Sequence, residues 1–441
     1  MTRVVVTAAG VLGPTANSLD EFSIALAGGV SGGRRITLFD PTGFPASVAA
    51  EVRGFNPEAP FEELSALAPD LTTGVLPRQD RKTALGLAAA LECARSSGID
   101  AWSKEPCALH LGTGLSSVSM AQLDVDMVPY LDERGGYDKV AFGEHALWRS
   151  SPAPWRHVTS EANRLIVAAL GLRGPTTSNF SACAASLQAM GRGFRDVQAG
   201  RVRRALVGGM DSMAHPFGMI SFIRLGALST SELAPECASR PFDKDRDGFV
   251  LGEGAVVVLL ESLDVARERG AKVLAEIVGY GTSIDAHMVT APHPNGEGAL
   301  LAMQRALRDA GIGPDALDYI NAHGTGTPLN DSTESRAIGR LFSEAGVARV
   351  SPVSSTKSMT GHLIAAAGVL EAMACVTATR DGFLPPSINI NTVDPDCDKH
   401  LKGAIVNSSR GVDADVRYAM TNSFGFGGQN GVLIVKRWED G

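Results

Sequence analysis

Short apolar runs punctuated by glycine alternate along the chain with segments of helical periodicity. Runs of this kind occupy residues 108–114, 204–209 and 254–261. Between them, residues 80–97 and 298–310 read as helices with one buried face. Continuous apolar runs are typical of strands that helices cover on both faces. The pattern therefore predicts an α/β protein built around buried sheets.

Two stretches share one order of strand, turn and helix. Residues 176–209 predict a strand, a turn, a helix and a second strand, and residues 318–355 predict the same order. Units of this kind place strands beside crossover helices. We therefore expect two α/β halves, an N-terminal one over residues 1–262 and a C-terminal one over residues 263–441.

Two other stretches depart from this alternation. Residues 124–151 are polar, aromatic and weakly periodic, and residues 34–80 also fit poorly into a strand and helix order. Irregular stretches of this length are usually surface insertions. We expect both to be inserted loops or a cap.

Composition narrows the class of protein. The chain has 441 residues, of which 44% are hydrophobic, so it can bury a large core. Its net charge of −8 and the lack of a basic run argue against nucleic acid as the main partner. An acidic partner would have to dock on a local basic patch.

Cysteine usage and hydropathy indicate a cytoplasmic protein. The six cysteines lie far apart, with no CxxC pair and no zinc-type cluster, so we expect neither disulfides nor a structural metal. The apolar run at residues 4–13 ends at a Gly-Pro pair and has no convincing cleavage site, so we interpret it as a first strand rather than a signal peptide. No apolar run approaches the ~18 residues of a membrane span.

The most informative stretch is residues 179–188, because it places Cys183 at a turn between a strand and a helix. The helix is indicated by apolar residues at three- and four-residue spacing, namely Leu187, Met190, Phe194 and Val197. Unpaired N–H groups and the helix dipole at its start favour a thiolate, which is a nucleophile. The alternative is a buried structural cysteine, the commoner fate of a free thiol.

Two histidine loops follow in the second half. His323 lies after a short apolar strand, among glycines and the hydroxyl donors Thr325 and Thr327. Strand ends are where α/β proteins concentrate their chemistry. A second strand, turn and helix segment contributes Lys357 and His362. Either loop taken alone also fits a polar surface.

Two further features complete the set. Glu371, on the next predicted helix, is placed to pair with Lys357, although solvent could serve that lysine equally well. Phe424 and Phe426 lie in a glycine turn before the closing strand at residues 432–435. A thiol, two imidazoles and a lysine on loops at strand ends indicate acyl transfer by thioester exchange, with imidazole N–H groups stabilising an oxyanion or enolate. The competing interpretation is a cysteine hydrolase, in which one imidazole activates water.

At these residues the chain closely resembles the β-ketoacyl-acyl carrier protein synthases, the condensing enzymes of the thiolase superfamily. The resemblance runs from the first strand to the last. It rests on the Cys183 turn, residues 239–254, the His323 loop, the Lys357 and His362 segment, and the closing Gly-Phe-Gly-Gly turn. It implies a thiolase-like fold, in which two fused α/β halves form a five-layered αβαβα core, and a dimer.

The resemblance also implies a mechanism. Cys183 would accept an acyl chain from the phosphopantetheine arm of an acyl carrier protein. His323 and His362 would promote decarboxylation of malonyl-carrier protein and stabilise the enolate that attacks the Cys183 thioester. Lys357, with Glu371, would organise His362 and the local charges. No metal and no cofactor beyond the carrier's arm are implied.

Further residues take their roles from the same resemblance. Phe426 would gate the site beside Phe424, and the backbone N–H groups of Cys183 and Phe426 would form the oxyanion hole. The remaining implied contacts are with the pantetheine arm, through Thr325 and Thr327, and with the acyl chain, through Leu115 and Phe222.

A basic cluster matches the region where relatives dock the acidic carrier protein. It consists of Arg78, Arg81 and Lys82, at the start of a predicted helix. The alternative is an ordinary charged helix start. Positive charge there is mildly unfavourable to the helix dipole, which favours a docking role.

Three departures bear on the substrate. Residues 184–187 lack the Ser- and Thr-rich flank of many relatives, residues 324–331 lean toward polyketide-type enzymes, and residues 124–151 are long. We therefore expect a specialised polyketide or polyene chain, with fatty-acid elongation as the alternative. Two alternatives remain: a chain-length partner subunit of a ketosynthase heterodimer, whose members generally lack the cysteine, and a thiolase or thioester hydrolase, although thiolases carry a second cysteine where this chain has Phe424 to Gly428.

Overall fold

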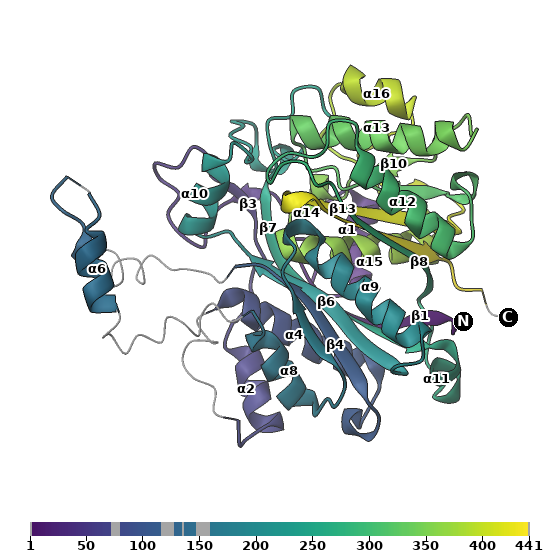
Figure 1. Cartoon of the computed structure of the whole chain (residues 1–441), viewed down its shortest axis with the longest axis horizontal. Coiled ribbons are helices and arrows are strands. Elements are labelled where there is room, and N and C mark those ends of the chain that lie inside the picture. Colours follow the sequence, from purple (N-terminus) through teal and green to yellow (C-terminus); the bar gives the residue numbers. More distant parts are fainter. Residues whose placement is uncertain (1, 72–79, 116–127, 135, 147–158, 440–441) are drawn as a thin grey trace.

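One mixed sheet runs through the molecule. The computed structural model describes residues 2–71, 80–115, 128–134, 136–146 and 159–439. The main strands lie in the order β10-β9-β13-β14-β8-β1-β7-β6-β4-β5 (Figure 1). The N-terminal ones are β1 (Val4–Leu12), β4 (Cys107–Thr113), β5 (Thr176–Asn179), β6 (Arg204–Ser212) and β7 (Leu251–Ser262). The C-terminal ones are β8 (Ala275–Ile284), β9 (Tyr319–Asn321), β10 (Val353–Ser354), β13 (Tyr418–Gly425) and β14 (Gln429–Lys436).

Strand β1 joins the two parts of this sheet. It pairs antiparallel with β7 along its length, and Val4, Val5 and Val6 also pair with β8. Every residue of β7 is buried, because neighbouring strands and helices cover it on all sides. Two short pairs complete the strands: β2 (Arg34–Arg35) with β3 (Val48–Ala50), and β11 (Phe383–Leu384) with β12 (Val412–Asp413).

Two helices lie between the two parts of the sheet. Helix α9 (Ala185–Gln198) contacts β4 and β6 on one side and β14 on the other, and α15 (Ala367–Asp381) packs beside it against β13. The apolar face of α9 predicted from the sequence is buried in this central core. The prediction of this helix is therefore confirmed.

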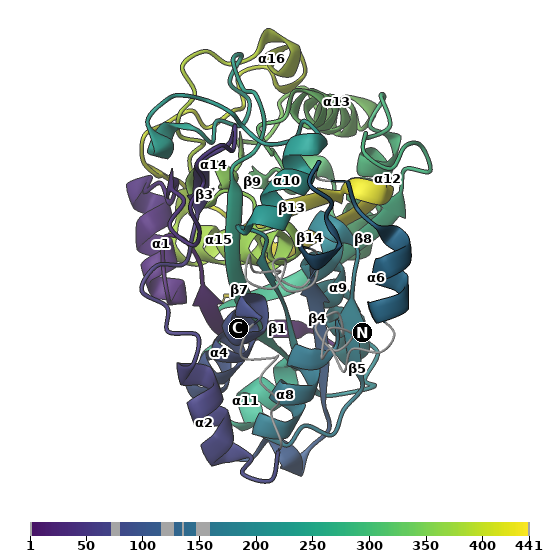
Figure 2. The same cartoon turned by 90° about the vertical axis from the view of Figure 1, so that its left-hand side faces the viewer.

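Further helices cover the outer faces, so the order of layers is helix, sheet, helix, sheet, helix (Figures 1 and 2). The outer N-terminal layer comprises α2 (Ala59–Leu67), α4 (Arg81–Ser97) and α8 (Glu161–Leu170). The outer C-terminal layer comprises α12 (Glu297–Ala310) and α13 (Pro328–Glu344). The other α-helices among the described residues are α1 (Leu19–Gly28), α6 (Lys139–Ala146), α10 (Pro216–Arg224), α11 (Leu263–Glu268), α14 (Lys357–Thr360) and α16 (Pro395–Leu401).

The predicted insertions differ from each other. Residues 34–71 contain β2, β3 and α2, so the first insertion is partly regular. Of residues 124–151, the structure describes 128–134 and 136–146. There Phe142 packs edge-on against Tyr130, and Figure 1 shows α6 projecting away from the layered body. The predicted boundary between residues 262 and 263 falls between β7 and α11 and stays a prediction.

Among the described helices, none combines the length and apolar character that a membrane crossing requires.

Candidate active site

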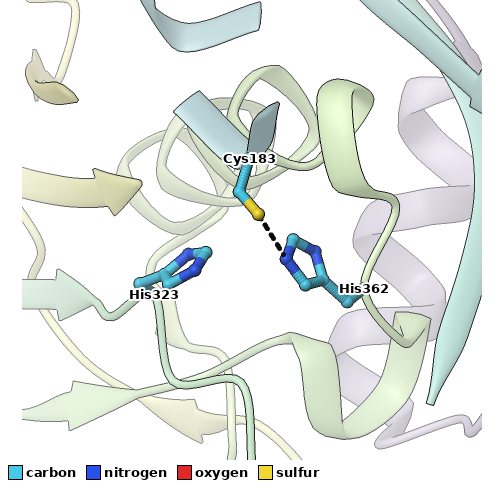
Figure 3. Close-up of side chains that lie close together, drawn as sticks. All are labelled: Cys183, His323 and His362. Atoms are coloured by element: carbon cyan, nitrogen blue, oxygen red, sulfur yellow. Dashed lines mark hydrogen bonds between the residues drawn. The ribbon is translucent and has the colours of Figure 1, made fainter. Parts of the chain in front are cut away.

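Three side chains from three loops meet at one point (Figure 3). Cys183 lies in a short 3-10 turn (Ala182–Ala184) between β5 and α9, His323 follows β9, and His362 follows α14. The His362 Nε2 atom is 3.1 Å from the Cys183 Sγ atom, and the two imidazole centroids are 5.3 Å apart. All three side chains are buried. The structure thus brings together the thiol and the two imidazoles predicted from the sequence.

The turn before α9 aims the thiol at the imidazoles. Ala182 has a φ of 47°, a left-handed conformation that is unusual for alanine. The closing turn lies directly against this elbow, since a Cβ atom on Gly425 would be only 3.1 Å from the Cys183 backbone nitrogen. The Phe426 backbone N–H group also donates to the Cys183 thiol. Two backbone segments therefore converge on the sulfur.

The tautomer of His362 follows from its backbone surroundings. The Ile364 N–H group donates to His362 Nδ1 at 3.2 Å. In a neutral imidazole one nitrogen accepts and the other carries the proton, so the proton lies on Nε2 and faces Cys183. Burial and the nearby charge of Lys357 hold the pKa of His362 well below its usual range. The ring is therefore neutral and donates toward the sulfur.

The same tautomer follows for His323. The Lys357 Nζ atom lies 3.3 Å from His323 Nδ1 and donates to the His323 carbonyl oxygen at 2.6 Å. An ammonium group can only donate, so Nδ1 accepts and Nε2 carries the proton. Burial and then the charge of Lys357 hold the pKa of His323 well below its usual range, and a proton on nearby His362 would lower it further. Both imidazoles are thus neutral N–H donors.

An ion pair lies behind the imidazoles. Lys357 is fully buried and pairs with Glu371, as the sequence suggested. Burial raises the pKa of Glu371 to about 7, although Lys357 opposes the rise. Lys357 contacts His323 and not His362. The expectation was that Lys357 organises His362.

The resting state of the thiol differs from the sequence expectation. Burial raises the pKa of Cys183 to about 12, outweighing the opposing effects of Lys357 and of the Phe426 N–H group. The expectation that the helix start alone favours a thiolate was therefore wrong, because desolvation is the larger effect in this buried turn. The N–H donors around the sulfur can instead stabilise negative charge that develops during reaction.

A cavity of about 400 Å³ leads to the three side chains. Its lining includes Phe424, Phe426, Thr325 and Thr327, all predicted from the sequence, and the two threonine hydroxyls are 2.9 Å apart. Phe222 is not among the described lining residues, but it lies behind Phe426, which is. The two rings are stacked, with their centroids 6.5 Å apart. Its predicted role against the acyl chain would act through that contact.

The predicted docking residues have other neighbours. Arg78 lies outside the described residues. Arg81 pairs with buried Glu253, and Lys82 is only 2% exposed and pairs with Asp80. A buried ammonium group cannot present its charge to a docking partner, so the docking prediction does not fit Lys82. Leu115 is 52% exposed, ends the described segment 80–115 and is absent from the described lining of the cavity.

One group of described side chains in this region could ligate a cation. The Cys183 sulfur and one ring nitrogen each of His323 and His362 lie within 4.8 Å of one another, but the Lys357 ammonium beside His323 opposes a second positive charge. Buried side-chain oxygens without a described hydrogen-bond partner also belong to Asn321, Glu371, Thr421, Asn422 and Ser423. The expectation that no metal is needed stays a prediction.

Two buried carboxylates escaped the sequence reasoning. Glu334, on α13, accepts from the backbone N–H groups of both His323 and Gly324 at 2.8 Å and so fixes the first histidine loop. Asp211, near the end of β6, accepts from the Ala365 N–H group at 3.0 Å, in the turn after His362. Asp211 could have been predicted as a site residue, because it is a carboxylate near the end of an apolar strand. Nothing in the local pattern of α13 distinguishes Glu334 from an exposed helical acid.

Comparisons with family models and curated proteins cover nearly the whole chain. The model of the β-ketoacyl synthase N-terminal domain matches residues 1–266, and that of the C-terminal domain matches residues 274–391. A 3-oxoacyl-[acyl-carrier-protein] synthase 2 from Coxiella burnetii is 39% identical over 443 residues, covering 99% of this chain and 98% of the relative. A protein of the same name from Vibrio cholerae is 38% identical, covering 99% of each.

Solved structures of ketosynthases are similar to this chain over nearly its whole length. The ishigamide ketosynthase/chain length factor has a TM-score of 0.83 and 33% identity, covering 99% of this chain and 100% of that chain. A β-ketoacyl synthase from Burkholderia phymatum has a TM-score of 0.81 and 30% identity, covering 100% of both chains. A type II polyketide synthase acyl-carrier protein in complex with its ketosynthase bound to the hexaketide, AntDE:AntF, has a TM-score of 0.80 and 28% identity, covering 99% and 100%.

Proposed function

Because this chain belongs to the β-ketoacyl synthase family, with its thiolase-like fold and acyltransferase chemistry, we propose that it extends acyl chains on an acyl carrier protein with Cys183 as the acyl acceptor. The observation that carries the proposal is the shared tautomer of His323 and His362. Both imidazoles are held with Nε2–H toward the cavity, so neither ring in this state accepts a proton from water there. The arrangement serves oxyanion and enolate stabilisation.

The first step loads the chain. The Cys183 sulfur attacks the thioester carbon of the acyl-carrier protein, an S–C bond forms, and the bond to the pantetheine sulfur breaks. The thiol proton ends on that departing sulfur. The backbone N–H groups of Cys183 and Phe426 bind the carbonyl oxygen in this proposal as it becomes negative. Support comes from the contact of the Phe426 N–H group with the Cys183 sulfur and from the close approach of Gly425 to the Cys183 nitrogen.

The second step makes the new carbon–carbon bond. Malonyl-carrier protein loses its carboxylate as carbon dioxide, and the bonding electrons become an enolate whose oxygen faces His323 and His362. The enolate carbon attacks the Cys183 thioester, and the S–C bond breaks with its electrons on sulfur. The departing Cys183 thiolate then takes up one proton from water to return the free thiol. Neutral imidazoles with a proton on Nε2 suit this step, because each ring can donate a hydrogen bond to the enolate oxygen without any prior change of protonation.

The cavity mouth is the proposed entrance for the pantetheine arm. Leu225, Val289 and Leu329 line it and are at least half exposed, with Val289 74% exposed. Exposed Arg224, at the last turn of α10, adds a positive charge beside Leu225. We place carrier-protein docking here rather than at Arg81 and Lys82.

The acyl chain is proposed to be of polyketide type. Support comes from the ishigamide and hexaketide-bound neighbours and from the departures in residues 184–187 and 324–331. The curated relatives are instead named 3-oxoacyl-[acyl-carrier-protein] synthase 2. A competition experiment tests this assignment. The enzyme is offered one carrier protein loaded with either a saturated or a polyene acyl chain of the same length, and preference for the saturated chain overturns the assignment.

Reconstitution tests the proposed reaction. The purified protein is given acyl-carrier protein and malonyl-carrier protein, and β-ketoacyl product, carbon dioxide and free acid are quantified. We expect product and carbon dioxide in equal amounts from the wild type and no product from Cys183→Ala. Free acid without β-ketoacyl product would identify a thioester hydrolase, and equal product from Cys183→Ala would rule out the assigned nucleophile.

A further inference from the structure

Side-chain hydrogen bonds hold the strained elbow that carries Cys183. The Asn179 Nδ2 atom donates to the Ala185 carbonyl oxygen at 3.0 Å and to the Ser181 hydroxyl at 3.1 Å. The Ser181 hydroxyl in turn donates to Gln188 Oε1 at 2.8 Å. These bonds span both sides of Ala182, whose φ is 47°. They therefore oppose relaxation of the elbow to a commoner backbone conformation.

The hydrogen bonds also fix the orientation of the Gln188 amide. The Ala185 carbonyl oxygen can only accept, so the Asn179 atom facing it is the nitrogen. That nitrogen also lies 3.3 Å from Gln188, which must present its oxygen there. The Gln188 nitrogen then points the other way, toward Gln429 Oε1 at 3.5 Å. One side chain thus accepts from the elbow and donates across to another segment.

That second segment supplies the other half of the proposed oxyanion hole. Gln429 directly follows the closing turn, Phe426–Gly428, and pairs across the hairpin with Gly425. The Phe426 N–H group contacts the Cys183 sulfur, and Gly425 packs against the Cys183 backbone nitrogen. Gln188 therefore connects the two backbone segments whose N–H groups must be a fixed distance apart to bind one oxygen atom.

We propose that Gln188 is a positioning residue that sets the spacing of these two N–H donors. The inference rests on the proposed function, because only acyl transfer develops a negative oxygen between Cys183 and Phe426. Gln188 is half-buried and absent from the described lining of the cavity, so it acts through the backbone rather than on the substrate. A small error in donor placement is enough to slow such a step, since 1 Å of misplacement can lower a rate by about a hundredfold.

Two reactions of Cys183 separate this role from general damage. Acylation by acyl-carrier protein develops an oxyanion, whereas alkylation by iodoacetamide displaces iodide from a saturated carbon and develops none. Both are followed as the modified Cys183 peptide by mass spectrometry. Loss of elbow packing or of thiol reactivity would slow both reactions to the same extent. Loss of donor spacing slows acylation far more than alkylation, which depends on the Phe426 N–H group only through the reactivity of the thiol.

Three variants divide the contacts of Gln188. Gln188→Ala removes the acceptor and the donor, and we expect acylation to slow by about ten- to a hundredfold. Gln188→Glu keeps the acceptor for Ser181 and Asn179 but loses the donor to Gln429, and Gln429→Ala removes the other partner. We expect each of these to slow acylation by about three- to tenfold. Both single variants remove the same contact, between Gln188 and Gln429. The double variant Gln188→Glu with Gln429→Ala should therefore acylate no more slowly than the slower of the two single variants.

Gln198→Ala is the matched control. Gln198 lies on the same helix ten residues further along, is also half-buried, and its side chain accepts one described hydrogen bond, from Arg195. It should acylate at the wild-type rate, and alkylation should stay within about twofold of wild type in every variant. Wild-type acylation by Gln188→Ala, or an equal fall in acylation and alkylation, overturns the assignment alone. A wild-type protein that accepts no acyl group overturns the proposed function and the assignment with it.

Discussion

Replacing Lys357 by methionine separates what the buried ion pair does for stability from what it does for the site. Lys357 pairs with Glu371 and approaches His323, and both charged side chains are buried. Methionine fills a similar volume without charge, so the variant leaves the Glu371 carboxylate buried and unpaired. Removing one partner of a buried pair typically destabilises a protein by about 3–5 kcal/mol.

The pH dependence of that loss can be worked out. Burial raises the pKa of Glu371 to about 7 even with Lys357 present, and removal of the ammonium raises it further. A carboxyl whose pKa is higher in the folded state than in the unfolded chain contributes stability at low pH that is lost as pH rises through the folded pKa. In the wild type this loss ends near pH 7, whereas in Lys357→Met it continues by about 1.4 kcal/mol per pH unit. The two proteins should therefore diverge by about a further 2 kcal/mol between pH 7 and pH 8.5.

Urea unfolding at pH 7 and pH 8.5 measures this divergence. The double variant Lys357→Met with Glu371→Gln carries no charge at either position, so its free energy of unfolding should recover to within about 1 kcal/mol of wild type and lose the extra pH dependence. Condensation should stay about a hundredfold low in both variants, because neither fixes the His323 tautomer. Equal destabilisation at the two pH values, or a double variant as unstable as the single one, would refute the reasoning.

Two further predictions concern the imidazoles and a buried acid. Replacing either His323 or His362 by phenylalanine keeps the ring shape but removes the N–H donor, and should lower the rate of β-ketoacyl product formation by about a hundredfold or more. A fall of less than about threefold would contradict the donor role. Burial raises the pKa of Asp211 to about 7, so this carboxyl contributes stability that is lost as pH rises from about 4 to about 7. Asp211→Asn should therefore show a shallower decline in the free energy of unfolding between pH 5 and pH 7.5, and an unchanged slope would count against the buried proton.

Much of the fold could be predicted because its elements have strong local patterns. The helix expected at residues 80–97 is α4, the one at 298–310 is α12, and the apolar run at 254–261 lies inside β7. What the pattern could not predict is that β1 pairs with both β7 and β8 and so makes one sheet of two halves. That pairing depends on contacts between residues 243 to 273 positions apart along the chain, which no local periodicity encodes.

The site was predictable where residue type and position coincide. Cys183, His323 and His362 stand at strand ends or helix starts, and the structure places them together (Figure 3). The charge state of Cys183 was not predictable, because it depends on how deeply the folded chain buries the sulfur. The burial of Lys82 escaped for the same reason, since a basic residue at a helix start reads as exposed until its neighbours are known.

Mass spectrometry of the Cys183 peptide tests the central claim most directly. When the enzyme is incubated with a carrier protein that is loaded with an acyl chain, and without malonyl-carrier protein, this peptide should gain the mass of the acyl group. Addition of malonyl-carrier protein should then remove that mass as an equal amount of β-ketoacyl-carrier protein forms. An acyl group on another residue, on none, or released from Cys183 as free acid without a new carbon–carbon bond would contradict the account.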